Sequence, residues 1–528
     1  MAGDVLYKRL DSRWKSACRL LFGGEVGELA RYREWLCEGL EPFEKRKSVL
    51  SGKEVYAVGK YPRGAPFISF DEVDYSRKFA PLSINEMKDI DSIQEALGER
   101  AVFCGNAILG NSSHAEESTG MEDCHFVLGC HTFHKSQDLA YCTIGREVKS
   151  SFGSSVIGES TFNIKGHNTW RASRCLCDQR VYESNDVFYS AYLDGCTECM
   201  FCFGLKGKRR MVGNAKLGES EYARVKKKLL SDIAGELEAK GRAPTIFEMV
   251  PKAPLRLSKP VTKQVPLSFD ESKVQAAFDE TCAIVLGRKL GSVRKYKEYL
   301  TRCIRNISSV KSAASGELVY VGGYQIDSDL AKSGRAVKLH ELYQIGAERQ
   351  WPEGIEPLKL ALSHMPAFIE PVAVFSTEEF VLTTNAAECS TVHYGNNVLC
   401  SSRAYHAKDC AYSCWPRDCD HMFGIDATRN SSFCIHCYNS YKLSRCFEVD
   451  TSQNCTGAYF CHNCENVHDS MFCFNAKNLR YAIGNAEVGK ETFEKAKKML
   501  LAEITASLEK TGDYRRSIYD IARSGKAR

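Results

Sequence analysis

The sequence predicts an α+β protein made of two tandem copies of three parts: a mixed α/β module, a cysteine-rich parallel β-solenoid of nonapeptide-type rungs, and a capping amphipathic helix. Three observations predict this fold: a regular cysteine series, an internal match between the two halves, and an apolar helical stripe at the end of each half. The cysteine series has a nine-residue spacing that only Thr428 interrupts: Cys410, Cys419, Cys437, Cys446, Cys455, Cys464 and Cys473. A short fixed period in a polar, β-prone stretch is typical of stacked coils, because equivalent residues recur on successive rungs.

The two halves of the chain repeat one plan. Residues 201–241 align without gaps to residues 472–512, with 17 identities over 41 positions. Upstream, residues 27–36 match residues 291–300 in the same order, so we predict a tandem duplication. A Gly-Asn-Ala triplet occurs at 213–215 and again at 484–486. It predicts the turn from each solenoid to its helix, since Gly and Asn tolerate positive φ.

The duplication sets the predicted domain boundaries. They are a first α/β module at 1–100, a first solenoid at 101–215, its capping helix at 216–249, a proline-rich linker at 250–270, a second module at 271–381, a second solenoid at 382–485 and a C-terminal capping helix at 486–528. Within the modules, residues 24–50 and 288–312 have helical character, and 54–61 and 317–324 resemble strands. Four prolines between 250 and 269 favour a semi-rigid linker.

The cysteine-rich windows predict a thin solenoid. In frames of nine residues, the third, sixth and ninth places are mostly Ser, Ala, Cys, Val or Leu, and the eighth is usually polar. Small residues inside and polar or aromatic residues outside suit a narrow interior, where cysteine serves as a small hydrophobe. The pattern leaves open whether one coil takes roughly 18 or roughly 27 residues, and we favour roughly 18, as in two-sheet β-rolls.

Each half ends in an amphipathic helix with one apolar stripe. The stripes are Tyr222, Val225, Leu229, Ile233 and Leu237 in the first half, and Phe493, Ala496, Leu500, Ile504 and Leu508 in the second. Because the end of a solenoid has an open hydrogen-bonding edge, we expect each helix to cover that end. A partner-binding helix is the alternative.

Three interpretations compete for the 25 cysteines. Structural packing of thiols in the core is favoured, since a regular ladder needs no particular ligand set. Zinc binding is the second, because a C-x-x-C turn brings two thiolates to one tetrahedral ion at about 2.3 Å each. The candidate ligands are Cys434, Cys437, Cys461, Cys464, Cys196, Cys199 and Cys202. Disulfides between stacked rungs are the third, and they require an oxidising compartment or a hyperthermophilic host.

The end of the first cysteine-rich window resembles a known group of proteins. The matching residues run from Cys199 to Lys208 and continue with Asn214, Glu221 and Tyr222, and residues 74–83 resemble the segment that precedes the repeats in that group. The group consists of Cys-rich repeat proteins of metagenome-derived bacteria and phages, described as hypothetical or zinc-ribbon proteins. This chain lacks the N-terminal zinc ribbon that many members carry. The resemblance therefore implies a fold and no established activity.

Composition and motifs restrict the function. A net charge of +5 on 528 residues does not favour nucleic acid or an anionic membrane as a partner. The sequence shows no leader-like N-terminus and no apolar run of membrane-spanning length, so a cytoplasmic location is expected. The repeats lack the paired glycines and regular Asp of calcium-binding rolls, which excludes Ca²⁺, and no nucleotide-binding fingerprint or nucleophile elbow appears.

These observations favour a non-enzymatic structural or interaction scaffold with a protein partner, although catalytic activity and oligomeric state stay open. The alternatives are a zinc-binding module that uses the C-x-x-C pairs and a structural component of a phage particle.

Overall fold

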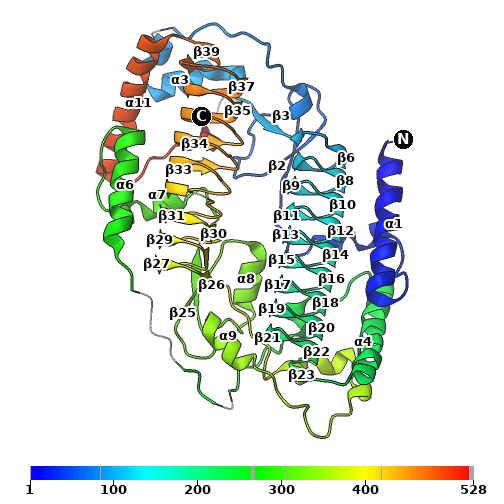
Figure 1. The fold of residues 1–528 in the computed structure, drawn as a ribbon. Helices are drawn as coiled ribbons and strands as arrows, with labels where there is room; N and C mark the ends of the chain where they lie inside the picture. The colour runs from blue at the N-terminus through cyan, green and yellow to red at the C-terminus, as the bar shows by residue number, and fades with distance from the viewer. Residues whose placement is uncertain are drawn as a thin grey trace.

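The computed structural model describes residues 2–83, 85–257, 259–262, 268–305, 307–417 and 419–522. The protein is mixed α+β, with most of its strands in long parallel sheets. The sheets form two stacks that lie side by side, and helices flank both (Figure 1). Among the described residues, none of the helices combines the length and apolar character needed to cross a bilayer.

The first stack consists of two sheets whose strands alternate along the chain. One sheet has ten strands: β6 (Ser113–Glu116), β8 (His125–Leu128), β10 (Gln137–Ala140), β12 (Lys149–Phe152), β14 (Thr161–Ile164), β16 (Ser173–Leu176), β18 (Asn185–Phe188), β20 (Thr197–Met200), β22 (Arg209–Val212) and β23 (Ala215–Lys216). The other has nine strands: β5 (Ile108–Leu109), β7 (Thr119–Glu122), β9 (His131–His134), β11 (Thr143–Arg146), β13 (Ser155–Gly158), β15 (His167–Trp170), β17 (Gln179–Tyr182), β19 (Ala191–Asp194) and β21 (Phe203–Lys206). Only β23 runs antiparallel, against β22.

The second stack is built in the same way but joins into one large sheet. Its strands are β27 (Thr384–Ala387), β29 (Asn396–Leu399), β31 (Ala407–Ala411), β32 (Cys419–Phe423), β33 (Ser432–Tyr438), β34 (Ser444–Asp450), β35 (Thr456–Glu465), β36 (His468–Met471), β37 (Phe474–Lys477), β38 (Ala482–Ile483) and β39 (Ala486–Glu487). At the start of this stack, a separate three-stranded sheet forms the opposite side. Its strands are β26 (Glu379–Val381), β28 (Thr391–His393) and β30 (Ala404–Tyr405). The antiparallel pair β38–β39 ends this stack as β22–β23 ends the first.

The nine-residue rungs predicted from the cysteines, and coils of 18 or 27 residues, are wrong. Parallel partners within the stacks lie twelve residues apart, as for Gln137 with Lys149 and Cys434 with Cys446, apart from an offset of thirteen at β5–β7. The underlying unit is three residues, because about every third residue adopts the left-handed conformation, for example Phe126, Gly129 and Thr132 with φ of 56°, 62° and 61°. Four of these units, twelve residues, separate one strand from its parallel partner. The cysteines recur every nine residues, which is three units, and so do not mark the pairing.

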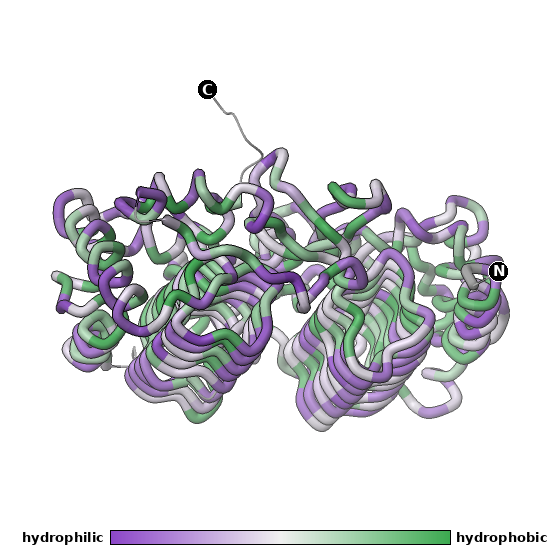
Figure 2. Tube along the Cα trace, turned by 90° about the horizontal axis from the view of Figure 1, so that it is seen from above, coloured by the Kyte–Doolittle hydropathy of each residue, from purple (hydrophilic) through white to green (hydrophobic). Residues whose placement is uncertain are grey.

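Small and apolar side chains fill the interior of each stack. Figure 2 looks along the two stacks, whose successive turns of chain lie one behind another. In the second stack, the cysteines share this interior with residues such as Val398, Val449 and Ala458. In the first, Cys175, Cys196 and Cys199 lie in one interior cluster. The position of cysteine in the core therefore agrees with the structural interpretation of the thiols.

A column of apolar residues at twelve-residue spacing lines the outer flank of each stack. The columns are Leu128, Ala140, Phe152, Ile164, Leu176, Phe188, Met200 and Val212 in the first stack, and Leu399, Ala411, Phe423, Ile435, Phe447, Tyr459, Met471 and Ile483 in the second. Helices α1 (Ala2–Phe22) and α4 (Glu219–Lys240) cover the first column, and α6 (Glu271–Leu286) and α11 (Lys490–Thr511) cover the second (Figure 1).

The predicted helical stripes are buried in α4 and α11. The prediction that these helices cover the open end of each stack is wrong. They lie against the flank, where they bury the apolar columns. Both helices end at a glycine in the left-handed conformation, Gly241 with φ 71° and Gly512 with φ 74°. Helices α1 and α6 were not predicted from the sequence.

Residues 24–50 and 288–312 contain less helix than predicted. In residues 24–50 the main helix is α2 (Arg33–Cys37), and the corresponding helix in residues 288–312 is α7 (Lys297–Thr301). The β-like runs are correct: β2 (Glu54–Ala57) pairs antiparallel with β1 (Glu44–Lys47), and β25 (Leu318–Val321) with β24 (Ser308–Lys311). Part of the predicted linker, residues 258 and 263–267, lies outside the described residues, as do residues 523–528 of the C-terminal segment.

Part of each module packs against the stack of the other half. A segment of the first half, with β3 (Phe67–Ser69), β4 (Phe103–Gly105) and α3 (Ile90–Leu97), packs in one core with the second stack and α12 (Ile518–Ile521). A segment of the second half, with α8 (Gln325–Lys332), α9 (Leu339–Ile345) and α10 (Met365–Ile369), packs in one core with the first stack and α5 (Ile246–Met249). Each half therefore completes the core of the other.

Candidate functional site

The thiols proposed as zinc ligands all lie inside the stacks. Cys434 and Cys437 are on β33, Cys461 and Cys464 are on β35, and all four side chains are buried. The candidates of the first stack, Cys196, Cys199 and Cys202, are buried at and around β20. Within the described residues, no group of three or more His, Cys, Asp or Glu side chains is arranged to hold a metal ion.

The register also keeps the two C-x-x-C pairs apart. Cys437 pairs with Val449, and Val449 pairs with Cys461, so a valine lies between the two cysteines in one column. Two strand spacings amount to about 9.6 Å, twice the ~4.8 Å between neighbouring strands. This separation is too long for both thiolates to bind one Zn²⁺ at about 2.3 Å each.

Some inward positions are occupied by serine and others by cysteine, and both side chains form hydrogen bonds to the backbone where the chain turns. Ser184 Oγ donates to Tyr182 O at 2.6 Å and accepts from Cys196 N, one turn later, at 2.9 Å. Cys130 does the same, since its Sγ donates to Leu128 O at 3.3 Å and accepts from Cys142 N at 3.2 Å. The alternation of Ser and Cys at inward places thus reflects the need to satisfy buried backbone groups.

Burial raises the pKa of most inward thiols, for example that of Cys124 to about 11. At Cys461 burial acts in the same direction, but hydrogen bonds with the neighbouring thiols of Cys464 and Cys473 outweigh it and lower the pKa. A protonated thiol donates a hydrogen bond, whereas a metal ligand or nucleophile must be a thiolate. The zinc hypothesis stays a prediction of the C-x-x-C pattern, and a content below about 0.2 zinc per chain in protein purified without a tag would exclude a resident ion.

Thiol titration tests this placement of the cysteines. Only Cys37 is exposed and Cys303 is half-buried, while the other 23 cysteines are buried. We expect native protein to react rapidly with an aromatic disulfide reagent at one thiol and slowly at a second, because the reagent must reach the sulfur. In denaturant without reductant, all 25 should react. A smaller count in denaturant would indicate disulfides, and many reactive thiols in the native protein would contradict the buried ladder.

A buried ionic cluster lies between the two stacks. Arg180 comes from the first stack, Arg403 from the second, and Asp327 from α8 between them (Figure 1). Asp327 Oδ1 is 3.6 Å from Arg180 Nη2, and its Oδ2 is 3.5 Å from Arg403 Nη2. Arg180 Nη1 also reaches Glu379 Oε2 at 3.0 Å, and Arg403 Nη2 reaches His167 Nε2 at 3.0 Å. These contacts connect the stacks, and sequence reasoning missed them all.

Two buried histidine–carboxylate pairs lie side by side on the second stack. His436 Nδ1 is 2.8 Å from Glu448 Oε1, and His462 Nδ1 is 2.9 Å from Asp450 Oδ2. The backbone N–H of Cys104 donates to His462 Nε2 at 2.9 Å, so the ring proton of His462 lies on Nδ1 and is donated to Asp450. Each side chain of both pairs has at most 1% of its surface exposed, and we assign them a structural role.

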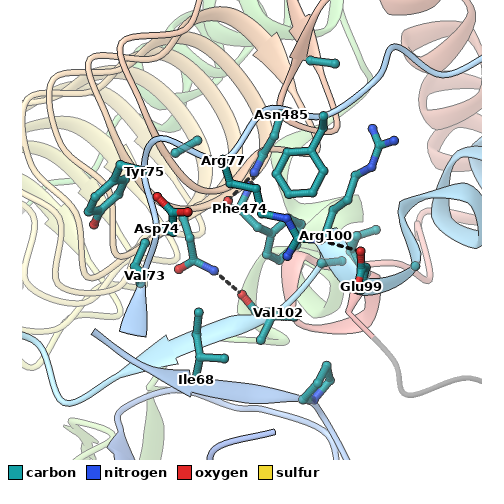
Figure 3. A pocket seen from close by; sticks show the side chains of 18 of the residues that line it. Ile68, Val73, Asp74, Tyr75, Arg77, Glu99, Arg100, Val102, Phe474 and Asn485 are labelled. Atoms are coloured by element: carbon teal, nitrogen blue, oxygen red, sulfur yellow. Dashed lines mark hydrogen bonds and ion pairs between the residues drawn. The ribbon is translucent and has the colours of Figure 1, made fainter. Parts of the chain in front are cut away.

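A cleft of about 1630 Å³ lies at the end of the second stack (Figure 3). Residues of the first half line one side, including Asp74, Tyr75 and Arg77, and β37 and β39 line the other. Further lining residues come from α3, from the segment that follows it, and from the C-terminal region at Arg516 and 520–521. Part of the segment 74–83, which resembles the segment before the repeats in the related group, thus lines this cleft, whereas no sequence pattern predicts that the segment meets the second stack.

The cleft combines aromatic rings with charges. Arg77 and Arg100 lie over the ring of Phe79, at 4.7 and 5.1 Å from its centroid, and Lys477 lies over Tyr75 at 4.4 Å. Arg77 also pairs with Glu99 at 2.5 Å. Rings with polar partners are common in surfaces that bind proteins, because they offer large apolar area together with cation and hydrogen-bond contacts.

A comparison of the chain with protein-family models, curated proteins and solved structures finds no match. The geometry of the chain itself therefore supplies the argument for its function.

Proposed function

We propose that this protein is a non-enzymatic interaction scaffold, built from two duplicated β-solenoids, that binds a protein partner in the cleft at the end of the second stack. Equivalent contacts in the two halves support the duplication. Asn214 bonds both the N–H and the C=O of Phe203 with its side chain, and Asn485 does the same for Phe474. The common twelve-residue register supports a solenoid in each half.

The observation that carries the binding proposal is the contrast between the two stack ends. At the end of the first stack, α9 packs on the edge strand β21, and a Cβ on Gly346 would lie 2.3 Å from Phe203 O. At the end of the second stack, the corresponding edge strand β37 faces the large cleft. One place is filled by the chain itself, and the other has room for a segment of another molecule.

Buried chemistry supports a role without catalysis. The side chains of His436 and His462, which each bond a buried carboxylate, have at most 1% of their surface exposed, and 23 of the 25 cysteines are buried. A catalytic group needs access to its substrate.

Site-specific photo-crosslinking tests the proposal. A benzoylphenylalanine at Lys78, an exposed residue lining the cleft, should crosslink a discrete partner protein in cells that express the chain. The matched control carries the same group at Lys149, an exposed residue on β12 of the first stack. Equal crosslinking from both sites, or none from the cleft, would refute a cleft-bound partner.

A further inference from the structure

At the end of the first stack, one residue of the second half pairs with the last strand of the sheet. The backbone N–H of Arg349 donates to Asn214 O at 3.0 Å, and Arg349 forms a parallel bridge with Ala215 on β23. The guanidinium of Arg349 extends this contact, because its Nε donates to Gly213 O at 2.7 Å. A single residue of the second half thus forms a parallel bridge with β23 at the end of the first stack.

At the second stack the flanking contacts recur without this bridge. Arg100 donates to Gly484 O at 3.1 Å, which is the carbonyl that matches Gly213 O. Tyr75 meets Lys477 as Tyr343 meets Lys206, with centroid distances of 4.4 and 4.8 Å.

The sheet edge between these contacts lies open to the cleft. Asn485, Ala486 and Glu487, which match residues 214–216, all line it. In the part of the chain that the structure describes, β39 pairs with β38 alone, and no extended residue takes the place of Arg349.

The charges around this edge favour a basic occupant. Seven carboxylates and five cationic side chains line the cleft, although the whole chain has a net charge of +5. The pairs Arg77–Glu99 and Arg516–Asp91 cancel within the cleft, whereas Lys477 pairs with Glu465 and Glu72 with Lys53 outside it, so an excess of two carboxylates remains. Glu95 and Glu487 are exposed carboxylates on opposite sides of the cleft.

We propose that the cleft binds an extended basic segment of a partner protein, which adds as a parallel strand to β39 and donates a backbone N–H to Asn485 O. This inference rests on the proposed interaction function and specifies how the partner docks. Main-chain hydrogen bonds supply affinity in strand addition, and side-chain contacts supply specificity. The carboxylates lining the cleft select lysine or arginine on the incoming strand.

Fluorescent peptides test the proposal on the full chain. The parent probe is the peptide of residues 345–352, which includes the residue that pairs with β23 in the first stack. A basic probe has lysine at the Glu348 position, and an acidic probe has glutamate at the Arg349 position. We expect fluorescence anisotropy at low salt to show the basic probe binding about tenfold more tightly than the acidic one, a difference in the range of one or two charge contacts.

N-methylated probes separate strand addition from simple charge attraction. A methyl on the amide nitrogen at position 349 removes the N–H predicted to bond Asn485 O, so it should weaken binding about tenfold. A methyl on the neighbouring amide at position 350, which points away in a parallel strand, is the control. Equal binding of the two methylated probes would overturn strand addition.

Protein variants locate the site. Glu95→Lys and Glu487→Lys should each weaken the basic probe, whereas Glu147→Lys, the same change at an exposed place on the first stack, should not. Equal affinity of the unmodified protein for the basic and the acidic probe would overturn the charge argument. If crosslinking from Lys78 captures a partner while all probes fail to bind, the docking mode is wrong and the interaction function stands.

Discussion

Replacement of Asp327 by asparagine should destabilise the protein by about 3–5 kcal/mol, the range for breaking a buried ion pair from one side. Asp327 is the carboxylate shared by Arg180 and Arg403, at 3.6 and 3.5 Å, and these three side chains have at most 3% of their surface exposed. Its loss leaves Arg403 without a carboxylate in its described ion pairs, while Arg180 keeps Glu379. Urea denaturation of the purified full chain measures the effect as a fall in the free energy of unfolding.

The control for this variant is Asp420→Asn. Asp420 pairs with Lys408 at 3.7 Å on the surface, where both side chains are more than half exposed. Exposed pairs contribute about 0–1 kcal/mol, so this variant should unfold with nearly the original midpoint. Similar effects of the two substitutions would show that the stacks do not depend on the ionic cluster between them.

Acid should destabilise the protein steeply below about pH 6.5, the ordinary histidine pKa. Burial and the neighbouring Arg305 lower the pKa of His131 to about 4. Burial, Arg403 and Arg180 hold the pKa of His167 well below its usual value. The unfolded chain therefore binds these protons at a higher pH than the folded chain. Stability is full above pH 6.5 and falls by about 1.4 kcal/mol per pH unit for each histidine as the pH drops toward the folded pKa values.

Urea midpoints at pH 7, 6 and 5 measure this acid response. His167→Gln removes one of the two titrations and keeps a side-chain oxygen as acceptor for Arg403. The variant should show a shallower loss of stability between pH 6.5 and pH 5 than the parent chain. A parent chain with constant stability over this range would contradict the assigned burial of both rings.

The parallel strands, the cysteine core and the helical stripes were predictable from the sequence. The repeat period was not, because the prediction took nine residues where the strands pair at twelve. The nine-residue series marks inward positions that are occupied by cysteine. The pairing of strands instead follows the twelve-residue spacing of the apolar column on the outer flank. Phe152, Ile164, Leu176 and Phe188 recur at twelve residues and are visible in the sequence. The nine-residue and twelve-residue periods are both multiples of three and overlap in the same segment. The cysteines make the nine-residue period the easier one to recognise in the sequence.

The ionic cluster and the cleft could not be predicted in the same way. Arg180, Asp327 and Arg403 are far apart in the chain and meet because part of each module packs against the stack of the other half. The cleft brings Asp74 and Arg100 to β37, across more than 370 residues of sequence. No local pattern encodes such encounters, since they depend on the placement of whole segments.

The packing of part of each module against the stack of the other half has a consequence for synthesis on the ribosome. Residues that seal the far end of the first stack, including Phe368 and Phe375, are translated more than 150 residues after β22. A growing polypeptide must therefore hold an unfinished hydrophobic surface until these residues emerge, and domains that wait in this way are prone to aggregate. The two halves are interlocked, so neither reaches its final form before most of the other has been made.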